Sequence, residues 1–470
     1  MKYFYTILGK AVVILTLTVS TFAAQAQITY SPYSRFGLGN LYSQGEVVNH
    51  SMGGVATPLA NPWVINQQNP ATYSSLVGPS FQFSSRLSIL RMNSKTQSET
   101  ATSGSLNNIA FGFPLRNDWG MAFGVTPFSS KSFNLSLSDS DPVAGDFERT
   151  YFGDGGISKF FIGVSKGFKI TTKTITRDSL GNPQDTIIST PHRIHLGANL
   201  NYYFGTLQNT QQIIFNDENF LNSQISTSTS LRGPGANFGL FYSTNLWKKF
   251  EGKKRVKNLS LQVGASYAIE SSMNGDTEYL SQTYQQLGAR PITVDTIAYS
   301  NTSDGSLVFP EKINAGVALK YTLQKRSFMI AVDYQQQSWS SIESDLPTIN
   351  KDVFSDAQQI SVGFEYKPNQ NFTDFNLSFH ELGSYRLGFR MSDTYLTLSG
   401  EPLTEMAVST GLSWPIKNSR SMSKFHLGME IGKRGTTENN LIEEEFIRAF
   451  VGFTLNPDFR NRWFRQRRYR

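Results

Sequence analysis

The chain has 470 residues, of which 39% are apolar, 13% aromatic and only 17% charged, and it contains 38 glycines and no cysteine. The absence of cysteine excludes disulfides, thiolate catalysis, Cys-ligated zinc, iron–sulfur clusters and a lipidated N-terminal cysteine. A mean hydropathy of −0.30 excludes a polytopic helical membrane protein, and the aromatic content argues against disorder. A large β protein rich in glycine and aromatic residues remains.

Residues 1–26 have the pattern of a secretory signal peptide. Lys2 and Lys10 precede an apolar run over 11–22, and Ala24-Gln25-Ala26 supplies a small-x-small cleavage site. A transmembrane anchor is the alternative, but the run is shorter than the roughly 20 residues that a spanning helix needs. We therefore expect export, and the β-rich body indicates the cell outer membrane as the destination.

Residues 80–456 alternate between apolar and polar side chains. Leu259, Leu261 and Val263, for example, interleave with Ser260 and Gln262. Successive side chains of a strand point to opposite faces, so each segment has one apolar and one polar face. A soluble sandwich would show the same alternation. Segments of 10–15 residues, aromatic residues near their ends and alternately short and long connections favour a transmembrane barrel.

The count of segments predicts an all-β fold, a 14-stranded antiparallel transmembrane β-barrel with an N-terminal hatch that plugs the lumen. The strands are expected to start near residues 80, 104, 119, 148, 192, 223, 257, 306, 326, 353, 382, 404, 420 and 442. An even count places both termini on the periplasmic side. The short links then fall on that side and the long polar ones outside, as is typical of such barrels. The short links are 116–118, 323–326 and 416–419, and the long ones are 132–147, 207–222 and 272–305.

One long link, 169–191, falls on the periplasmic side. It is expected to form a hairpin around Gly181-Asn182. An additional strand pair in this link would raise the count to sixteen.

Residues 27–79 are not strand-like. They are dense in Gly, Pro, Asn and Ser, but Tyr30, Tyr33, Phe36, Met52 and Trp63 are too apolar for a flexible linker. A segment of this length, joined to the start of a barrel and carrying anchors suited to burial, is expected to fill the lumen.

Two motifs support a family resemblance. Ser51-Met52-Gly53-Gly54, followed by Asn61-Pro62-Trp63 and Asn69-Pro70-Ala71, resembles the N-terminal hatch of the long-chain fatty-acid transporter (FadL-like) family. The segment 123–128 is similar to that family's third strand. The resemblance implies a plugged fourteen-stranded barrel for passive uptake of hydrophobic molecules. It assigns a gating role to Ser51, Met52, Gly53, Gly54, Asn69, Pro70 and Ala71, and a lateral exit to Gly124, Pro127 and Phe128.

Pro127 has a physical consequence of its own. Proline cannot donate to a β-ladder, so in a barrel wall it removes one inter-strand bond and favours a kink or gap. A gap at bilayer depth would let an apolar solute leave sideways into lipid. The alternative is that Pro127 ends its strand at the external rim.

Basic residues gather in two segments, 248–257 and 459–470, which together carry a net charge of +11. Both are expected on the periplasmic side, where they would bind anionic headgroups or an acidic partner. Export excludes nucleic acid as a partner. The tail 457–470 interleaves aromatic residues with arginine, which favours docking to lipid or protein through Arg460, Arg462, Trp463, Arg465, Arg467 and Arg468.

Signals for an enzyme or a metal site are weak. The motif Gly163-Val164-Ser165-Lys166-Gly167 fits G-x-S-x-G but lies on an expected strand rather than at a strand-to-helix turn. His192 and His195 fall on opposite faces of a strand. A calcium ion at Asp139, Asp141 and Asp146 is less favoured than a solvated loop. We expect no catalytic residue, metal or cofactor.

Two functions follow. The leading one is passive uptake of small hydrophobic molecules through a hatch-gated lumen, with lateral exit at the kinked third strand. The alternative is a non-conducting FadL-like subunit of an outer-membrane secretion or protein-assembly complex. The polarity expected at the inward positions Lys320, Glu270, Arg386 and Arg390 counts against a fatty-acid channel.

Overall fold

The computed structural model describes seven stretches of the chain. They are residues 31–177, 183–217, 219–251, 254–287, 290–370, 378–416 and 422–457. The expected signal peptide and the six docking residues of the tail lie outside the described residues, so both remain predictions.

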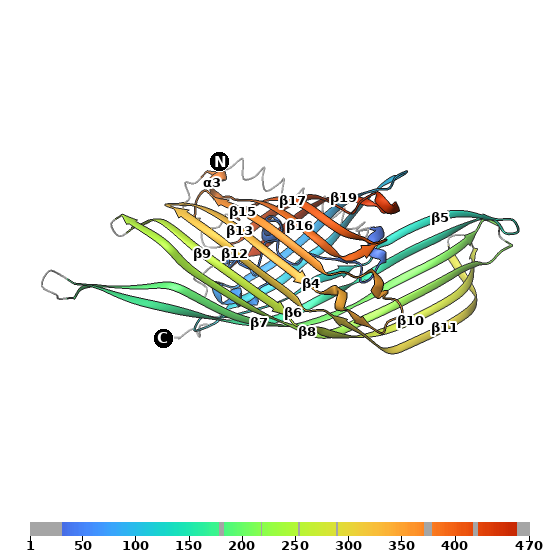
Figure 1. The fold of residues 1–470 in the computed structure, drawn as a ribbon, viewed down its shortest axis with the longest axis horizontal. Coiled ribbons are helices and arrows are strands. Elements are labelled where there is room, and N and C mark those ends of the chain that lie inside the picture. The colour runs from blue at the N-terminus through green and yellow to red at the C-terminus, as the bar shows by residue number, and fades with distance from the viewer. Residues whose placement is uncertain are drawn as a thin grey trace, which may run out of the picture.

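Fourteen antiparallel strands form a closed barrel, which confirms the predicted fold and strand count (Figure 1). Each strand pairs with its neighbours in the wall, and the last strand pairs with the first, Leu455 lying opposite Phe81. The wall strands are β2 (Ser80–Asn93), β3 (Ser98–Pro114), β4 (Trp119–Ser130), β6 (Gly145–Arg177), β7 (Pro183–Phe215), β8 (Asn222–Glu251), β9 (Lys254–Ala268), β12 (Lys312–Leu323), β13 (Arg326–Gln337), β15 (Ala357–Lys367), β16 (Ser384–Leu398), β17 (Glu401–Pro415), β18 (Lys424–Arg434) and β19 (Glu443–Leu455).

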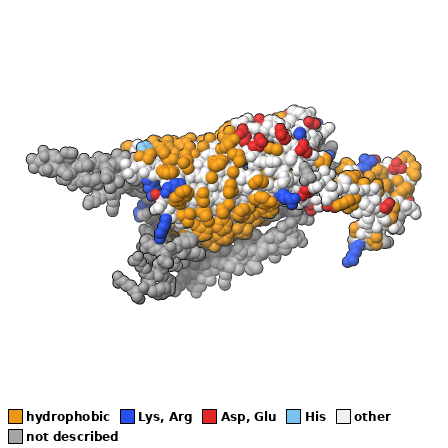
Figure 2. Space-filling model, turned by 90° about the horizontal axis from the view of Figure 1, so that it is seen from below, with side chains coloured by type: hydrophobic (Ala, Val, Ile, Leu, Met, Phe, Trp, Pro, Cys, Tyr) orange, Lys and Arg blue, Asp and Glu red, His pale blue; other side chains and the backbone are white. Residues whose placement is uncertain are grey.

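The alternation of side chains separates two environments. On β15 the apolar Ile360, Val362 and Phe364 face outward, while Ser361 and Glu365 are buried inside. The same division holds on β16 and β18, and Figure 2 shows hydrophobic side chains gathered over the visible face of the wall. Among the described residues, no helix has the length and apolarity needed to cross a membrane.

The three long links predicted as polar loops are instead mainly strands, so that prediction is wrong. β5 (Phe133–Asp141), β10 (Ser271–Leu287) and β11 (Arg290–Phe309), with the far ends of β6, β7 and β8, form a sheet beyond the barrel rim (Figure 1). We call residues 133–152, 206–231 and 272–306 the blade. These stretches are rich in Ser, Thr and Gln, whose uncharged side chains are compatible with paired strands in water. The expected strand near residue 306 is likewise corrected, since the wall strand there begins at Lys312.

Glycines mark the line along which the blade leaves the barrel. Gly156 pairs with Thr206 on β7, and Gly205 pairs with Ile157 on β6. A Cβ at either glycine would collide with a backbone carbonyl of the neighbouring strand. Side-chain-free positions on adjacent strands therefore permit the close approach that bends the sheet.

The link 169–191 is paired from Ile170–His192 to Arg177–Pro183, with register shifts after Ile170 and after Thr176, so it is a hairpin extension of β6 and β7. It adds no wall strand. The expected turn at Gly181-Asn182 falls in 178–182, outside the described residues.

Residues 31–79 lie within the barrel, and we call them the hatch segment. It contains η1 (Pro32–Arg35), β1 (Asn40–Leu41), α2 (Val47–His50) and η2 (Pro70–Ser75). Its side chains are largely buried, Leu38, Met52 and Tyr73 completely so. The remaining short elements are η3 (Trp339–Ser341), β14 (Glu343–Ser344), η4 (Lys351–Val353), α3 (Phe379–Leu382) and η5 (Glu438–Asn440).

Candidate functional site: the filled lumen and the break in the wall

The hatch segment is in backbone contact with glycines on the inner face of the wall. A Cβ at Gly388 would meet the backbone of Met52 and Gly53, and one at Gly264 would meet that of Thr57. Gly120, Gly197 and Gly239 make the same approach to residues 69–74. Because only glycine permits such proximity, these positions fit the wall to the hatch segment and leave no side-chain space between them.

The residues predicted to gate the lumen lie at two of these contacts. The amide of Gly53 donates to Ser409 Oγ at 2.8 Å, and Ser51 lies against Gly411 and Gly428. Asn69 Nδ2 donates to the carbonyl of Leu240 at 3.0 Å. Thus 51–54 contact β16 to β18, and 69–71 contact β7 and β8, across the barrel from one another in strand order.

Asp333 on β13 is the contact that sequence reasoning missed. Its Oδ2 accepts from the backbone amides of Ala56 and Thr57, both at 2.8 Å, and the side chain is completely buried. A carboxylate that accepts two backbone amides fixes the path of the hatch segment. Its position on the inner face of β13 was readable from the alternation, but nothing in the sequence revealed its partners.

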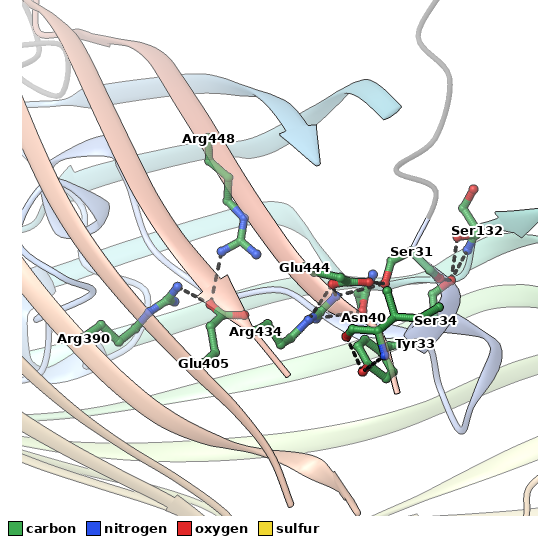
Figure 3. Close-up of polar contacts among 11 residues, drawn as sticks. Ser31, Tyr33, Ser34, Asn40, Ser132, Arg390, Glu405, Arg434, Glu444 and Arg448 are labelled. Carbon is green, nitrogen blue, oxygen red and sulfur yellow. Dashed lines mark hydrogen bonds and ion pairs between the residues drawn. The ribbon is translucent and has the colours of Figure 1, made fainter. Parts of the chain in front are cut away.

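Charged side chains cross-link the inner wall. Arg390 and Arg448 both pair with Glu405, at 2.5 and 3.3 Å (Figure 3). Both also pair with Glu430, at 3.0 and 2.7 Å. Arg386 pairs with Glu365 at 2.7 Å in a second buried cluster. The expected inward placement of Arg386 and Arg390 is confirmed, and Lys320 lines an inner cavity. Glu270 is corrected, since it is exposed in the link after β9.

The charged residues of the wall are also hydrogen-bonded to the hatch segment. Arg434 Nε donates to Glu444 at 2.8 Å, and its guanidinium also donates to Ser31 and Asn40 (Figure 3). The Tyr33 hydroxyl donates to the carbonyl of Ile442 at 2.5 Å. The first described residues are therefore held at the blade end of the barrel, whereas the hatch segment joins β2 at the opposite end.

Two buried titratable groups lie on the hatch segment itself. Glu46 accepts from Asn108 Nδ2 at 2.9 Å and from Ser84 Oγ at 3.2 Å, and burial raises its pKa to about 7. His50 stacks on Phe450 with ring centroids 4.3 Å apart, and burial lowers its pKa to about 4. Near neutral pH the His50 ring is therefore uncharged within the arginine-rich cluster.

Cavities between the hatch segment and the wall are small and lined by charge. One of about 70 Å³ is bordered by His50, Arg86, Arg390 and Glu430. Another of about 310 Å³ is bordered by residues that include Trp63, Lys320, Glu365, Lys367 and Lys424. Such surroundings suit water or ions rather than an apolar solute.

The wall is broken beside Pro127. β3 and β4 pair only between Ile109–Pro114 and Gly120–Val125, and the ladder between β4 and β6 shifts register between Pro127 and Ser129. β4 continues past Pro127 to Ser130, where it pairs with β1 of the hatch segment. Proline therefore lies at a kink within the strand rather than at its end.

The hatch segment is hydrogen-bonded to the kinked strand. Gln44 Nε2 donates to the carbonyl of Pro127 at 2.8 Å, and Thr126 Oγ1 donates to Gln44 Oε1 at 2.8 Å. Phe128 packs against Tyr203 and Phe309. Of the predicted exit residues, Gly124 lies in the paired part of the strand and Pro127 and Phe128 at the kink. Their role in solute exit stays a prediction.

The weaker sequence motifs have structural roles. Ser165 of the G-x-S-x-G match accepts from the amide of Ser74 at 2.5 Å, so it binds the hatch segment. His195 contacts Ser74 at 2.7 Å inside the barrel, while His192 contacts Tyr242 at 2.7 Å, which confirms that the two rings lie on opposite faces. Asp139 pairs with Arg149 at 3.1 Å on the blade.

These features define a transmembrane barrel of the outer-membrane type whose lumen is filled by its own N-terminal segment. The family model described as BamG matches residues 7–176 and 187–470, so the chain belongs to the BamG family. No curated protein matches the sequence.

Solved structures of hydrophobic-compound transporters share the fold, as the FadL-like resemblance predicted. The Ralstonia pickettii toluene transporter TbuX is 13% identical with a TM-score of 0.51, and 88% of this chain and 99% of that chain are covered. The Pseudomonas putida toluene transporter TodX is 14% identical with a TM-score of 0.50, over 88% and 98% of the two chains. At these identities the likeness concerns the fold.

Proposed function

We propose that the chain is a non-conducting subunit of an outer-membrane protein complex. The filled lumen is the observation that carries the proposal. The hatch segment meets glycines on at least five wall strands at backbone distance, and Asp333 and the arginine–glutamate clusters hold the same interior. An apolar solute passing through would have to displace buried charges from their partners, at a cost of several kcal/mol for each pair broken.

The blade supports the same proposal. A sheet that projects beyond the rim adds surface without adding to the lumen, which suits contact with other proteins. We infer that the blade lies outside the cell and that the opposite end of the barrel, with the basic tail, lies in the periplasm. Because the natural chain lacks cysteine, a single Val143→Cys variant on the blade tests this orientation. A membrane-impermeant maleimide is expected to label it in intact cells, and labelling only after lysis would reverse the orientation.

Two measurements on the native chain test the complex. A tagged chain, gently solubilised from outer membranes, should purify with a partner at constant stoichiometry. Cells that carry the chain in their outer membrane should take up toluene no faster than cells that lack it. Toluene uptake by a barrel that purifies alone would overturn the proposal.

Hydrophobic uptake is the second candidate, and the broken wall at Pro127 favours it. The solved barrels that share the fold include two toluene transporters. If solute leaves through the kink, Pro127→Val should slow uptake of toluene while the barrel assembles normally. Pro142→Val, in the exposed turn of the blade, is the control and should leave uptake unchanged. Equal uptake by the native chain and the Pro127 variant would remove the lateral exit.

For the C-terminal tail, residues 457–470, we propose a docking role. Interleaved arginine and aromatic residues after Pro457 suit docking to anionic lipid or to an acidic protein. Deletion of 458–470 should then weaken association with vesicles containing anionic lipid, or with the co-purified partner, and leave heat-modifiable barrel mobility unchanged.

A further inference from the structure

One edge of the blade is unpaired along most of its length. β11 pairs with β10 from Arg290 to Phe309, but within the described part of the chain its other edge carries a neighbour only near Leu307 and Val308. An open edge presents a row of free backbone donors and acceptors to which another strand can add. This edge belongs to the blade, so it lies beyond the lipid-facing belt and is reached from water.

The chain shows that this edge accepts a strand. β14 adds to β11 through Ser344 and Glu343, and the amide of Asp345 donates to the carbonyl of Ser306 at 3.0 Å. The added strand covers only the part of the edge nearest the rim. The next stretch, 298–302, has regular register with β10, and among the described residues no strand pairs with its outer side.

Register shifts limit what can bind along the edge. β11 carries extra residues relative to β10 near 294, 297 and 303–304, on either side of the regular stretch. Bulges twist an edge and interrupt pairing, so they discourage indiscriminate strand addition. A bound segment is therefore short, about five residues, and its position is fixed by the bulges.

Apolar side chains along β11 are exposed to water. Ile297 and Tyr299 are 63% and 59% exposed, and Ile292 and Val294 about half. Lipid covers the outward-facing apolar residues of the wall. These four residues lie on the blade, where no lipid covers them. Large apolar residues exposed along one strand outside the membrane favour a protein contact.

Charge selects the kind of partner. The three stretches of the blade contain ten acidic and two basic residues, a net charge of −8, whereas the whole chain is +7. Glu278, Asp276 and Asp295 are on β10 and β11 themselves. A field of this sign repels anionic lipid headgroups and acidic proteins and attracts a basic segment.

We propose that the free edge of β11 at 298–302 binds a short, extended, basic segment of another protein by strand addition. The inference rests on the proposed function and names the surface and chemistry through which the complex forms. Backbone pairing supplies direction, Tyr299 and the adjoining Ile297 supply buried area, and the acidic blade supplies the preference for lysine and arginine.

A defined peptide tests the chemistry. The full chain in lipid nanodiscs is titrated with a fluorescent peptide of alternating lysine and valine, and with its glutamate counterpart. We expect the basic peptide to bind at least tenfold more tightly, and its affinity to fall when salt rises from about 50 to 500 mM. Equal affinity for the two peptides would overturn the proposal.

Matched variants test the position. Ile297→Ser combined with Tyr299→Ser removes apolar area from β11, while Leu137→Ser combined with Val143→Ser removes similarly exposed residues from the opposite side of the blade. The first pair should weaken the basic peptide at least tenfold, and the second less than twofold. Equal effects, or a larger effect of the control pair, would overturn the assignment to β11.

The same variants separate this inference from the proposed function. If the native chain purifies with a partner and the β11 variant loses it while the control keeps it, both stand. If both variants keep the partner, strand addition at β11 is wrong and the complex remains. If the native chain purifies alone and conducts toluene, the proposed function fails irrespective of the peptide result.

Discussion

Replacing Asp333 with alanine should release the hatch segment while the barrel remains folded. The carboxylate accepts two backbone amides, from Ala56 and Thr57, at 2.8 Å each. A hydrogen bond to a charged group contributes about 1.5–3 kcal/mol, and a buried amide left without a partner costs about as much. Loss of both bonds should therefore weaken this part of the hatch segment by about 3–6 kcal/mol. The lower value corresponds to about a 150-fold increase in local opening.

Hydrogen exchange with mass spectrometry measures that opening directly. Peptides that include residues 56–57 should exchange at least 100-fold faster in the Asp333→Ala variant, with the wall strands unchanged. Asp276→Ala is the control, because Asp276 is partly exposed on the blade and pairs with Arg232 at 3.1 Å. It should leave exchange of the hatch segment unaltered. Native exchange rates in the Asp333 variant would refute the role of this carboxylate in holding the hatch segment.

Three further outcomes are expected. Because burial raises the pKa of Glu46 to about 7 from 4.5, its contribution to order in the hatch segment is complete below about pH 4.5 and is lost as the pH rises through about 7. After correction for the pH dependence of intrinsic amide exchange, protection of 46–50 should fall over that range in the native chain and stay constant in Glu46→Gln. Gly388→Val should expel the hatch segment and increase its proteolysis, whereas Gly104→Val, which faces only a flexible leucine, should not. Arg390→Met should destabilise the barrel by about 3–5 kcal/mol in thermal unfolding, because two buried glutamates lose a partner, and Arg232→Met by less than about 1 kcal/mol because its pair is exposed.

The barrel could be predicted from the sequence because its physics is periodic. A strand between lipid and a filled lumen must place Ile360, Val362 and Phe364 on one face and Ser361 on the other. This constraint produces the alternation of apolar and polar residues in the sequence. Closure of the barrel then follows, because an unpaired edge is not tolerated in lipid. The alternation does not define the strand ends, because it fades where both faces of a strand meet water.

The sequence predicts that the interior of the barrel is polar, but not which side chains contact one another. The alternation placed Arg386 and Arg390 inside, but it did not identify Glu365 and Glu430 as partners. Those pairs join strands 20 to 40 residues apart in sequence, and their geometry depends on the shear of the closed barrel. The contact between Asp333 and the hatch segment spans more than 270 residues and has no local signal at either end.

The blade was missed because the alternation that reveals a membrane strand requires two different media. In the blade both faces meet water or polar neighbours, so segments such as 272–286 have little apolar contrast, and their low hydrophobicity predicts loops. Uncharged Thr, Ser and Gln nevertheless sustain long paired strands, and the glycines at 156 and 205 allow them to leave the barrel without breaking the sheet. A barrel that only conducts needs no sheet beyond its rim. In the proposed complex, the length of these strands, their acidic charge and the open edge of β11 would serve contact with another protein. Disruption of that edge and disruption of the lumen should therefore have separate consequences.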